Sequence, residues 1–248
     1  MRKFLLGTLA FGLVLGLAHR ALAEDTAQAI IDKAIKAHGG AKKLSTVRGI
    51  QAKTKGKIEI AGGLEFTQET SLQPPDKFKE VLDLEVKGQN VTVTTVFDGK
   101  KAWVNANGTT TELEDKFVAE FKEVAHLTRV SRLTTLKDKS FKLSPLGEVK
   151  VNDRPAVGIK VSSKGHKDIS LYFDKKTGLV AKTERRTLDA MTKAEVTEER
   201  IVTEYQDVDG SKVAKNVIVN HDGKKFLEAE VTEVKFVDKI DDSEFDKP

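Results

Sequence analysis

The 248-residue sequence contains no cysteine. This absence excludes disulfide bonds, thiol catalysis and metal sites built from cysteine. It also removes the residue to which a bacterial lipoprotein attaches its lipid. The folded protein must be stabilised by its hydrophobic core, and a chain of this length can bury a large one.

Residue patterns typical of enzymes are also missing. Four histidines beyond the first 23 residues are far apart and form neither a His-x-x-x-His nor a His-Glu-x-x-His motif, so a zinc hydrolase has no support. No Gly-x-Ser-x-Gly motif and no glycine-rich phosphate-binding loop is present. The sequence therefore predicts a protein that is not an enzyme and uses neither cofactor nor metal. The four residues are His38, His126, His166 and His221.

Neither sign of charge is in large excess. Lys and Arg number 42 against 38 acidic residues, and three of the basic residues precede residue 24, which lowers the net charge from +4 to +1 for the rest. A near-neutral chain argues against nucleic-acid binding, which needs a concentrated basic face. The basic clusters Lys53-Lys55-Lys57 and Arg185-Arg186 are interpreted as solvated strand faces. The acidic tail Asp241-Asp242 with Glu244 is interpreted as solvated terminal charge.

Long apolar runs are absent except at the start. Residues 4–18 are apolar, follow Arg2 and Lys3, and precede Ala21-Leu22-Ala23, whose small residues suit a signal peptidase. The run is shorter than the ~20 residues that span a bilayer. The sequence predicts a cleavable signal peptide over residues 1–23 and one domain over residues 24–248. A retained membrane anchor is the alternative.

Strand signals fill most of the remaining chain. Between residues 49 and 236, runs of alternating apolar and polar residues are separated by polar turns, and Asp98-Gly99, Asp209-Gly210 and Asp222-Gly223 are typical hairpin turns. Successive hairpins form an antiparallel meander. The fold class is therefore mainly β with helices: an incomplete antiparallel β-barrel, a half-barrel, of about 11–12 strands.

Two helical segments accompany these strands. Residues 25–38 carry an apolar stripe at helical spacing and end at Gly39-Gly40. Residues 111–136 begin with a capping box formed by Thr111 and Glu114, and an apolar stripe follows. We expect the second segment to interrupt the strands and to cover the concave face of the sheet.

A curved sheet with an apolar concave face must fill that face with side chains, a helix or a ligand. Alternation places several apolar residues of neighbouring strands on this face, and the alternative to a cavity is a core filled by side chains. The candidate ligand-binding residues are Phe66, Leu72, Phe78, Leu82, Leu84, Val91, Val93, Phe97, Phe117, Phe121, Val124, Leu171 and Phe173.

Several segments carry a recognisable pattern: 37–40, 75–78, 97–100, the hairpin LYFDKKTGLV at 171–180, YQDVDGSKV at 205–213, and the last strand and tail at 231–245. Together they resemble the LolA-like outer-membrane lipoprotein-sorting proteins. The resemblance covers most of the chain after residue 23, and its specificity lies in the order and spacing of the segments.

The resemblance implies a hydrophobic cavity for the acyl chains of a lipoprotein or another lipid. It also implies a periplasmic, monomeric carrier (a lipid-binding chaperone) with transient membrane contact, served by an inner-membrane releasing transporter and an outer-membrane acceptor. The basic residue on which the proteobacterial carrier depends has no position here that matches. An envelope module that senses a lipid or a partner through the same fold is the alternative function.

Overall fold

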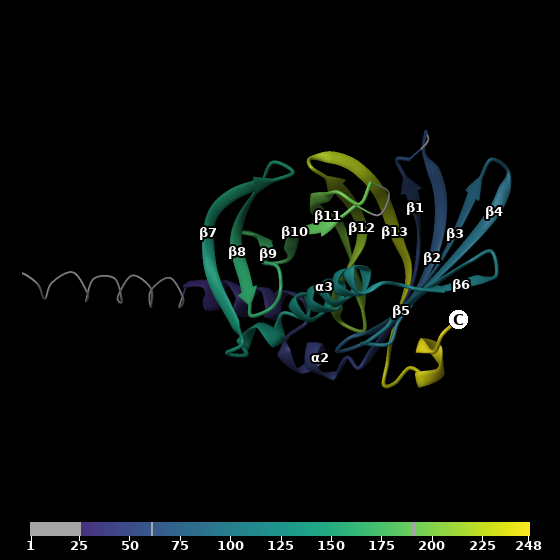
Figure 1. The fold of residues 1–248 in the computed structure, drawn as a ribbon. Helices are drawn as coiled ribbons and strands as arrows, with labels where there is room; N and C mark the ends of the chain where they lie inside the picture. Colours follow the sequence, from purple (N-terminus) through teal and green to yellow (C-terminus); the bar gives the residue numbers. More distant parts are fainter. Residues whose placement is uncertain (1–25, 61, 190–191) are drawn as a thin grey trace, which may run out of the picture.

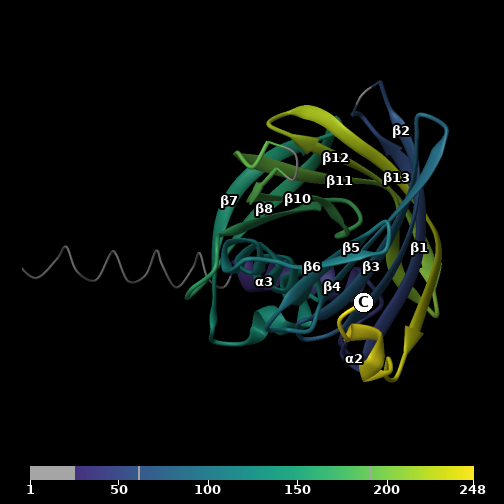
Figure 2. The ribbon, with the colours of Figure 1, turned by 45° about the vertical axis from the view of Figure 1, so that its right-hand side comes forward.

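The computed structural model of the protein describes residues 26–60, 62–189 and 192–248. The expected signal peptide, residues 1–23, lies outside these ranges. The described strands form one antiparallel sheet that curls around the helices without closing on itself (Figures 1 and 2).

Thirteen strands belong to this sheet in the described part of the chain. They are β1 (Gly49–Ile58), β2 (Leu64–Gln73), β3 (Lys77–Val86), β4 (Gln89–Phe97), β5 (Ala102–Ala106), β6 (Thr109–Glu112), β7 (Phe141–Val151), β8 (Arg154–Ser163), β9 (Ile169–Asp174), β10 (Val180–Leu188), β11 (Glu195–Val208), β12 (Ser211–His221) and β13 (Lys224–Val237).

The strand order is β6-β5-β4-β3-β2-β1-β13-β12-β11-β10-β9-β8-β7. Every neighbour except the pair β1 and β13 is also a neighbour in sequence, as a meander of hairpins requires. Pairing of β1 with β13 joins the two meanders into one wall, with β6 and β7 as its edges. The sheet thus has two halves, β1–β6 and β7–β13.

Helices occupy the inside of this wall. The N-terminal helix is described over residues 26–37, and its stop at Gly39 and Gly40 is confirmed by φ angles of 117° and 89°. Helix α3 (Asp115–Ser131) and the 3₁₀ turn η1 (Thr134–Lys137) connect the edge strands β6 and β7 (Figure 2). Two short elements, α2 (Ala41–Thr46) and η2 (Asp242–Phe245), complete the fold.

Two of the three predicted Asp-Gly turns are confirmed as two-residue hairpin turns; the third, Asp98-Gly99, lies in the loop 98–101, where only Gly99 has a positive φ angle. Asp209-Gly210 has φ angles of 51° and 73°, and Asp222-Gly223 has φ angles of 48° and 76°. Both central residues therefore adopt the left-handed conformation that a two-residue hairpin turn needs. Since these turns fix where each strand reverses, they also fix which side chains share a face.

The sequence-based description of the second helix was wrong at its start. Thr111 lies in β6 and pairs with Val104 of β5, so it does not cap a helix. Glu114 occupies the N-cap position of α3, with no side-chain cap hydrogen bond. Strand β6 is short and polar and lacks apolar alternation, which is why about 11–12 strands were expected instead of thirteen.

Candidate hydrophobic hollow

Strand register defines rows of side chains on the concave face. Paired residues of antiparallel strands point to the same face, and the face alternates along each strand. One row runs Ile50, Leu72, Phe78, Phe97, Ala102 across β1 to β5. A second row, four pairs further along, brings together Gln68, Leu82 and Val93. A third brings together Gly56, Phe66, Leu84 and Val91.

Helix α3 covers the first of these rows. The Phe121 ring lies 5.4 Å from the Phe78 ring and 6.1 Å from the Phe97 ring, centroid to centroid. Val124 and Leu72 pack against the same cluster, in which Phe97 is completely buried. These five predicted residues therefore form the contact between α3 and the sheet.

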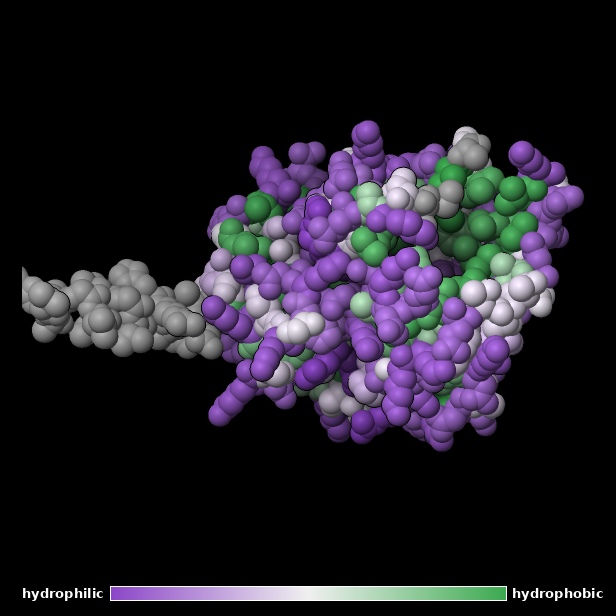
Figure 3. Space-filling model, in the orientation of Figure 1, coloured by the Kyte–Doolittle hydropathy of each residue, from purple (hydrophilic) through white to green (hydrophobic). Residues whose placement is uncertain are grey.

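Apolar side chains on the same face beyond α3 remain partly exposed. Leu82, Leu84, Val91 and Val93 are neither buried nor fully exposed. Figure 3 shows hydrophobic residues gathered around a hollow on the inner side of these strands. We call this surface the open wall and define it by the third-row residues and by Leu82 and Val93.

A glycine shapes the open wall. A Cβ added at Gly56 would lie 2.2 Å from the Glu228 carbonyl oxygen and 2.8 Å from the Phe66 ring. Gly56 therefore leaves room for the Phe66 ring beside β1, where the ring is 6% exposed. Any larger residue there would displace backbone as well as the ring.

Between the α3 cluster and the open wall lies a belt of polar side chains. Thr70, Glu80 and Thr95 are paired across β2, β3 and β4. Burial raises the pKa of the Glu80 carboxyl, and a hydrogen bond with Gln68 offsets part of this effect. The belt thus adds hydrogen-bonding groups to a largely apolar face.

The other half of the concave face is filled. Ile31, Ala34 and Ile35 of the N-terminal helix pack in one cluster with Ile159, Leu171, Phe173 and others. Leu171 is completely buried, and Phe173 is 1% exposed. Both predicted residues therefore line the core under the N-terminal helix, away from the open wall.

Phe117 joins neither cluster. Its ring lies under the ammonium groups of Lys116 and Lys193, at 4.9 and 5.1 Å from the centroid. Phe117, one of the thirteen predicted residues, therefore lies at the start of α3 and does not pack on the concave face.

Polar contacts fix the opposite side of α3. Glu120 accepts hydrogen bonds from Lys167 Nζ at 2.9 Å and from Thr187 Oγ1 at 3.3 Å. Glu123 is paired with His166 Nδ1 at 3.0 Å. The helix is therefore held by apolar packing on β3–β5 and by carboxylates on the β8–β10 side.

A histidine stack lies beneath this polar side of α3. The rings of His126 and His166 are 3.8 Å apart and nearly parallel. The pKa of His126 is lowered to about 4, mainly by burial and further by the neighbouring His166. His126 is therefore neutral at physiological pH.

A polar network on β10–β12 was not anticipated from the sequence. Arg185 was interpreted as part of a solvated face, but its side chain is only 12% exposed and donates from Nε to Glu198 at 2.8 Å. His221 contacts Asp189 at 3.1 Å through Nδ1. Because Arg185 pairs with Ile169 and Glu198 with His221, all of them point into the concave side.

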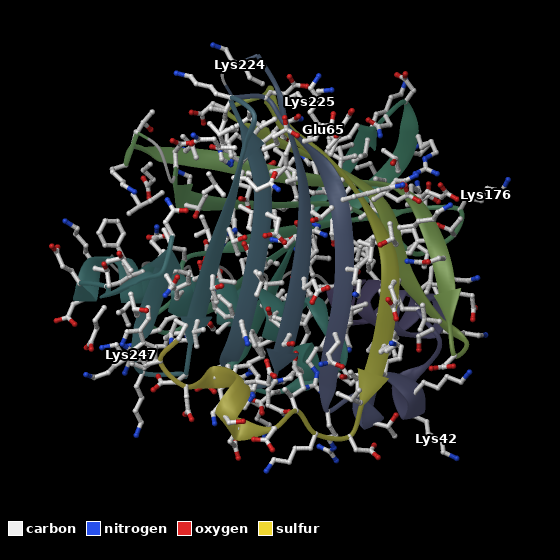
Figure 4. The ribbon with its side chains drawn as sticks, turned by 90° about the vertical axis from the view of Figure 1, so that its right-hand side faces the viewer. Lys42, Glu65, Lys176, Lys224, Lys225 and Lys247 are labelled. Atoms are coloured by element: carbon white, nitrogen blue, oxygen red, sulfur yellow. The ribbon has the colours of Figure 1, made fainter. Side chains whose placement is uncertain are left out.

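Much of the convex face carries solvated charge, apart from an apolar cluster formed by Val96, Trp103, Ile240 and Phe245. Lys53–Glu69 and Lys55–Glu230 are among its exposed ion pairs, as expected for the lysine cluster of β1. Figure 4 views this outer face, with Glu65, Lys224 and Lys225 at one end of the strands.

None of the helices in the described ranges is long and apolar enough to cross a membrane.

Three solved structures share the architecture. A LolA superfamily protein from Nitrosomonas europaea superposes with a TM-score of 0.56 at 9% identity, covering 89% of this chain and 97% of that one. An outer membrane lipoprotein-sorting protein domain from Vibrio parahaemolyticus gives 0.55 at 10% identity, with 90% and 97% covered. The fold is LolA-like.

The third structure is a DUF1329 family protein from Desulfovibrio piger, with a TM-score of 0.54, 13% identity and 89% and 97% of the two chains covered. No family model matches the sequence, and no curated protein matches it. At these identities the likeness establishes the shared fold, and the function must be argued from the residues of the hollow.

Proposed function

We propose that the protein is a periplasmic carrier that binds the acyl chains of a lipoprotein or another lipid non-covalently. The observation that supports this function best is the open wall, an apolar concave surface that no helix of the described chain covers. Monomeric soluble proteins rarely leave a large contiguous apolar surface in contact with water unless it binds something. The LolA-like fold is consistent with this proposal.

Acyl binding at this wall needs no reactive group. Each CH₂ removed from water contributes ~0.8 kcal/mol, so a chain of ordinary length is retained by burial alone. The same absence of covalent chemistry allows release to an acceptor. Export by the signal peptide, loading by an inner-membrane transporter and delivery to an outer-membrane acceptor complete the proposed cycle.

Of the thirteen candidate residues, we assign direct ligand contact to the open-wall residues. Phe66, Leu82, Leu84, Val91 and Val93 are the members that face the hollow beyond α3. The residues beneath α3 would join the site only if that helix moved.

Binding of a fluorescent fatty acid to the purified protein tests the proposal. We expect saturable binding by the wild type and at least tenfold weaker binding by Leu82→Asp, because the new carboxylate stays hydrated where the acyl chain must lie. Val81→Asp is the matched control, since Val81 is the next residue of β3, is similarly exposed, and faces the convex side.

The control should bind the probe like the wild type. Absence of saturable binding by the wild type, or equal binding by both variants and the wild type, would refute the carrier proposal. Circular dichroism of each variant separates loss of binding from loss of folding.

A further inference from the structure

Arg200 of β11 is a cation inside the half-barrel. It pairs with Thr183 of β10 and Val219 of β12, and Thr183 pairs with the buried Leu171. Its side chain therefore starts on the concave face, in the same row as the core under the N-terminal helix. Its neighbours Val202 and Val219 are 6% and 7% exposed.

The guanidinium nevertheless reaches water. Arg200 belongs to the exposed residues, although the residues around it on the concave side are buried or partly buried. Burial by the surrounding walls lowers the pKa of the Arg200 guanidinium, and the nearby Glu198 carboxylate partly opposes this effect. The exposure of Arg200 and its lowered pKa are both explained if the guanidinium lies in the water-filled hollow. An arginine remains charged there.

Arg200 has no fixed anion of its own. Within the described ranges it forms no hydrogen bond and no ion pair, and Glu198 is already bonded to Arg185. A second unused donor lies nearby, because Nη1 of Arg185 is buried without a hydrogen-bond partner, as is Nε2 of His221. Glu198 lies 3.7 Å from that Nε2 and Asp189 contacts the other ring nitrogen, so these acids are engaged with neighbours.

An apolar track leads from Arg200 to the open wall. The row of Arg200 continues through Val219, Leu227, Ile58 and Leu64. The open wall begins at Gly56 on β1, which is three strand spacings from β11, about 14 Å along the sheet. One acyl chain spans ~15 Å, half the hydrocarbon core of a bilayer, and can therefore reach from Arg200 to the start of the open wall.

We propose that Arg200 binds the head group of an anionic amphiphile, a carboxylate or a phosphate, whose acyl chain follows this track onto the open wall. The proposal rests on the proposed carrier function and adds the class of ligand. Arg200 supplies charge and donors, and Nη1 of Arg185 is a second donor within the same network.

Three probes with the same pyrene-labelled chain test the assignment at pH 8: a fatty acid, a monoalkyl phosphate and the uncharged methyl ester of the acid. We expect the wild type to bind both anions about tenfold or more tightly than the ester, as charge-assisted hydrogen bonds imply. Arg200→Gln should lose this preference, with ester binding changed less than about twofold. Arg200→Lys should retain part of it.

Arg186→Gln is the matched control. Arg186 lies on the neighbouring strand but is exposed on the convex face, paired with Glu195 at 3.0 Å. This variant should keep the wild-type preference for the anions. Circular dichroism should show all the variants folded, since an exposed guanidinium is replaced in each.

The outcomes separate the two proposals. Equal affinity of acid and ester in the wild type, or an anion preference that survives Arg200→Gln, overturns the head-group assignment and leaves the carrier function standing. Failure of all three acyl probes to bind the wild type overturns both. Binding of inorganic phosphate alone that depends on Arg200, without any acyl binding, would identify a free-anion site and also overturn the assignment.

Discussion

The two halves of the sheet use the same architecture for different ends. In the half that contains β7–β10, the N-terminal helix lies against the concave face, and residues such as Leu171 are completely buried. In the half that contains β1–β4, α3 covers only the rows near Phe78 and Phe97. Leu82 and Leu84 on the same face remain partly exposed.

The difference shows that the position of a helix decides which apolar residues are core. Alternation along a strand places Leu171 and Leu84 on concave faces of similar composition. A helix that carries Ile31 and Ile35 completes one surface. The other surface has no such partner within the described chain, and it is the surface to which our proposal assigns the ligand.

The largest expected effect comes from placing a charge in each half. Leu171→Asp buries an unpaired carboxylate under the N-terminal helix, which costs about 4 kcal/mol or more, and we expect this variant not to fold. Leu84→Asp leaves its carboxylate in contact with water in the hollow, so we expect a folded protein whose melting temperature falls by only a few degrees. Thermal unfolding followed by circular dichroism measures both.

Equal losses in the two variants would contradict the distinction between a filled and an open half. They would mean that the open wall is packed in solution as tightly as the core beneath the N-terminal helix.

Most strands could be predicted because their signals are local. The turn at Asp222-Gly223 needs two positive φ angles, which Gly provides and Asp tolerates, and alternation around such turns then defines the strands. Strand β6 and helix α2 were missed because Thr109–Glu112 and Ala41–Thr46 have no apolar periodicity. Their structure depends on pairing and contacts with other segments.

The site could be predicted only in part, because it depends on register between distant strands. Phe121 was correctly expected to meet the concave strands, since the stripe of α3 has helical spacing. Arg185 and Arg200 were not found, because their inward direction follows from pairing with Ile169 and Thr183. A bulge after Val202 changes the alternation along β11, so counting residues cannot replace the register.

A moderate effect is expected from the histidine stack that supports α3. The unfolded chain binds a proton at His126 near its ordinary pKa of 6.5, whereas the folded protein does so only near a pKa of about 4. Acidification through this window therefore favours unfolding, by up to about 3 kcal/mol. Denaturant unfolding at pH 7 and pH 4.5 should show the loss.

His126→Phe provides the control for this window. The Phe ring can stack on His166 and Phe141 as the imidazole does, but it cannot be protonated. We expect the variant to lose clearly less stability than the wild type between the two pH values. An unchanged difference would assign the acid sensitivity to other groups that face this region, such as Glu123 or His166.

The smallest expected effect tests the polar belt of the open half through Glu80→Gln. Burial raises the pKa of Glu80, so between its ordinary value of 4.5 and its folded value the native state binds the proton more tightly than the unfolded chain does. Stability from this group is therefore present at low pH and is lost as pH rises through the folded pKa. Gln keeps the side-chain shape and can still hydrogen-bond Gln68, but it carries no charge at any pH. We expect Glu80→Gln to be more stable than the wild type at pH 8 by about 1 kcal/mol or less, with no gain at pH 4.

The exposed Glu85 of the same strand is the control, and Glu85→Gln should not change the pH dependence. A loss of stability at pH 8 on Glu80→Gln would mean that the ionised carboxylate is stabilised in the hollow, and the belt would then belong with the charged network of β10–β12.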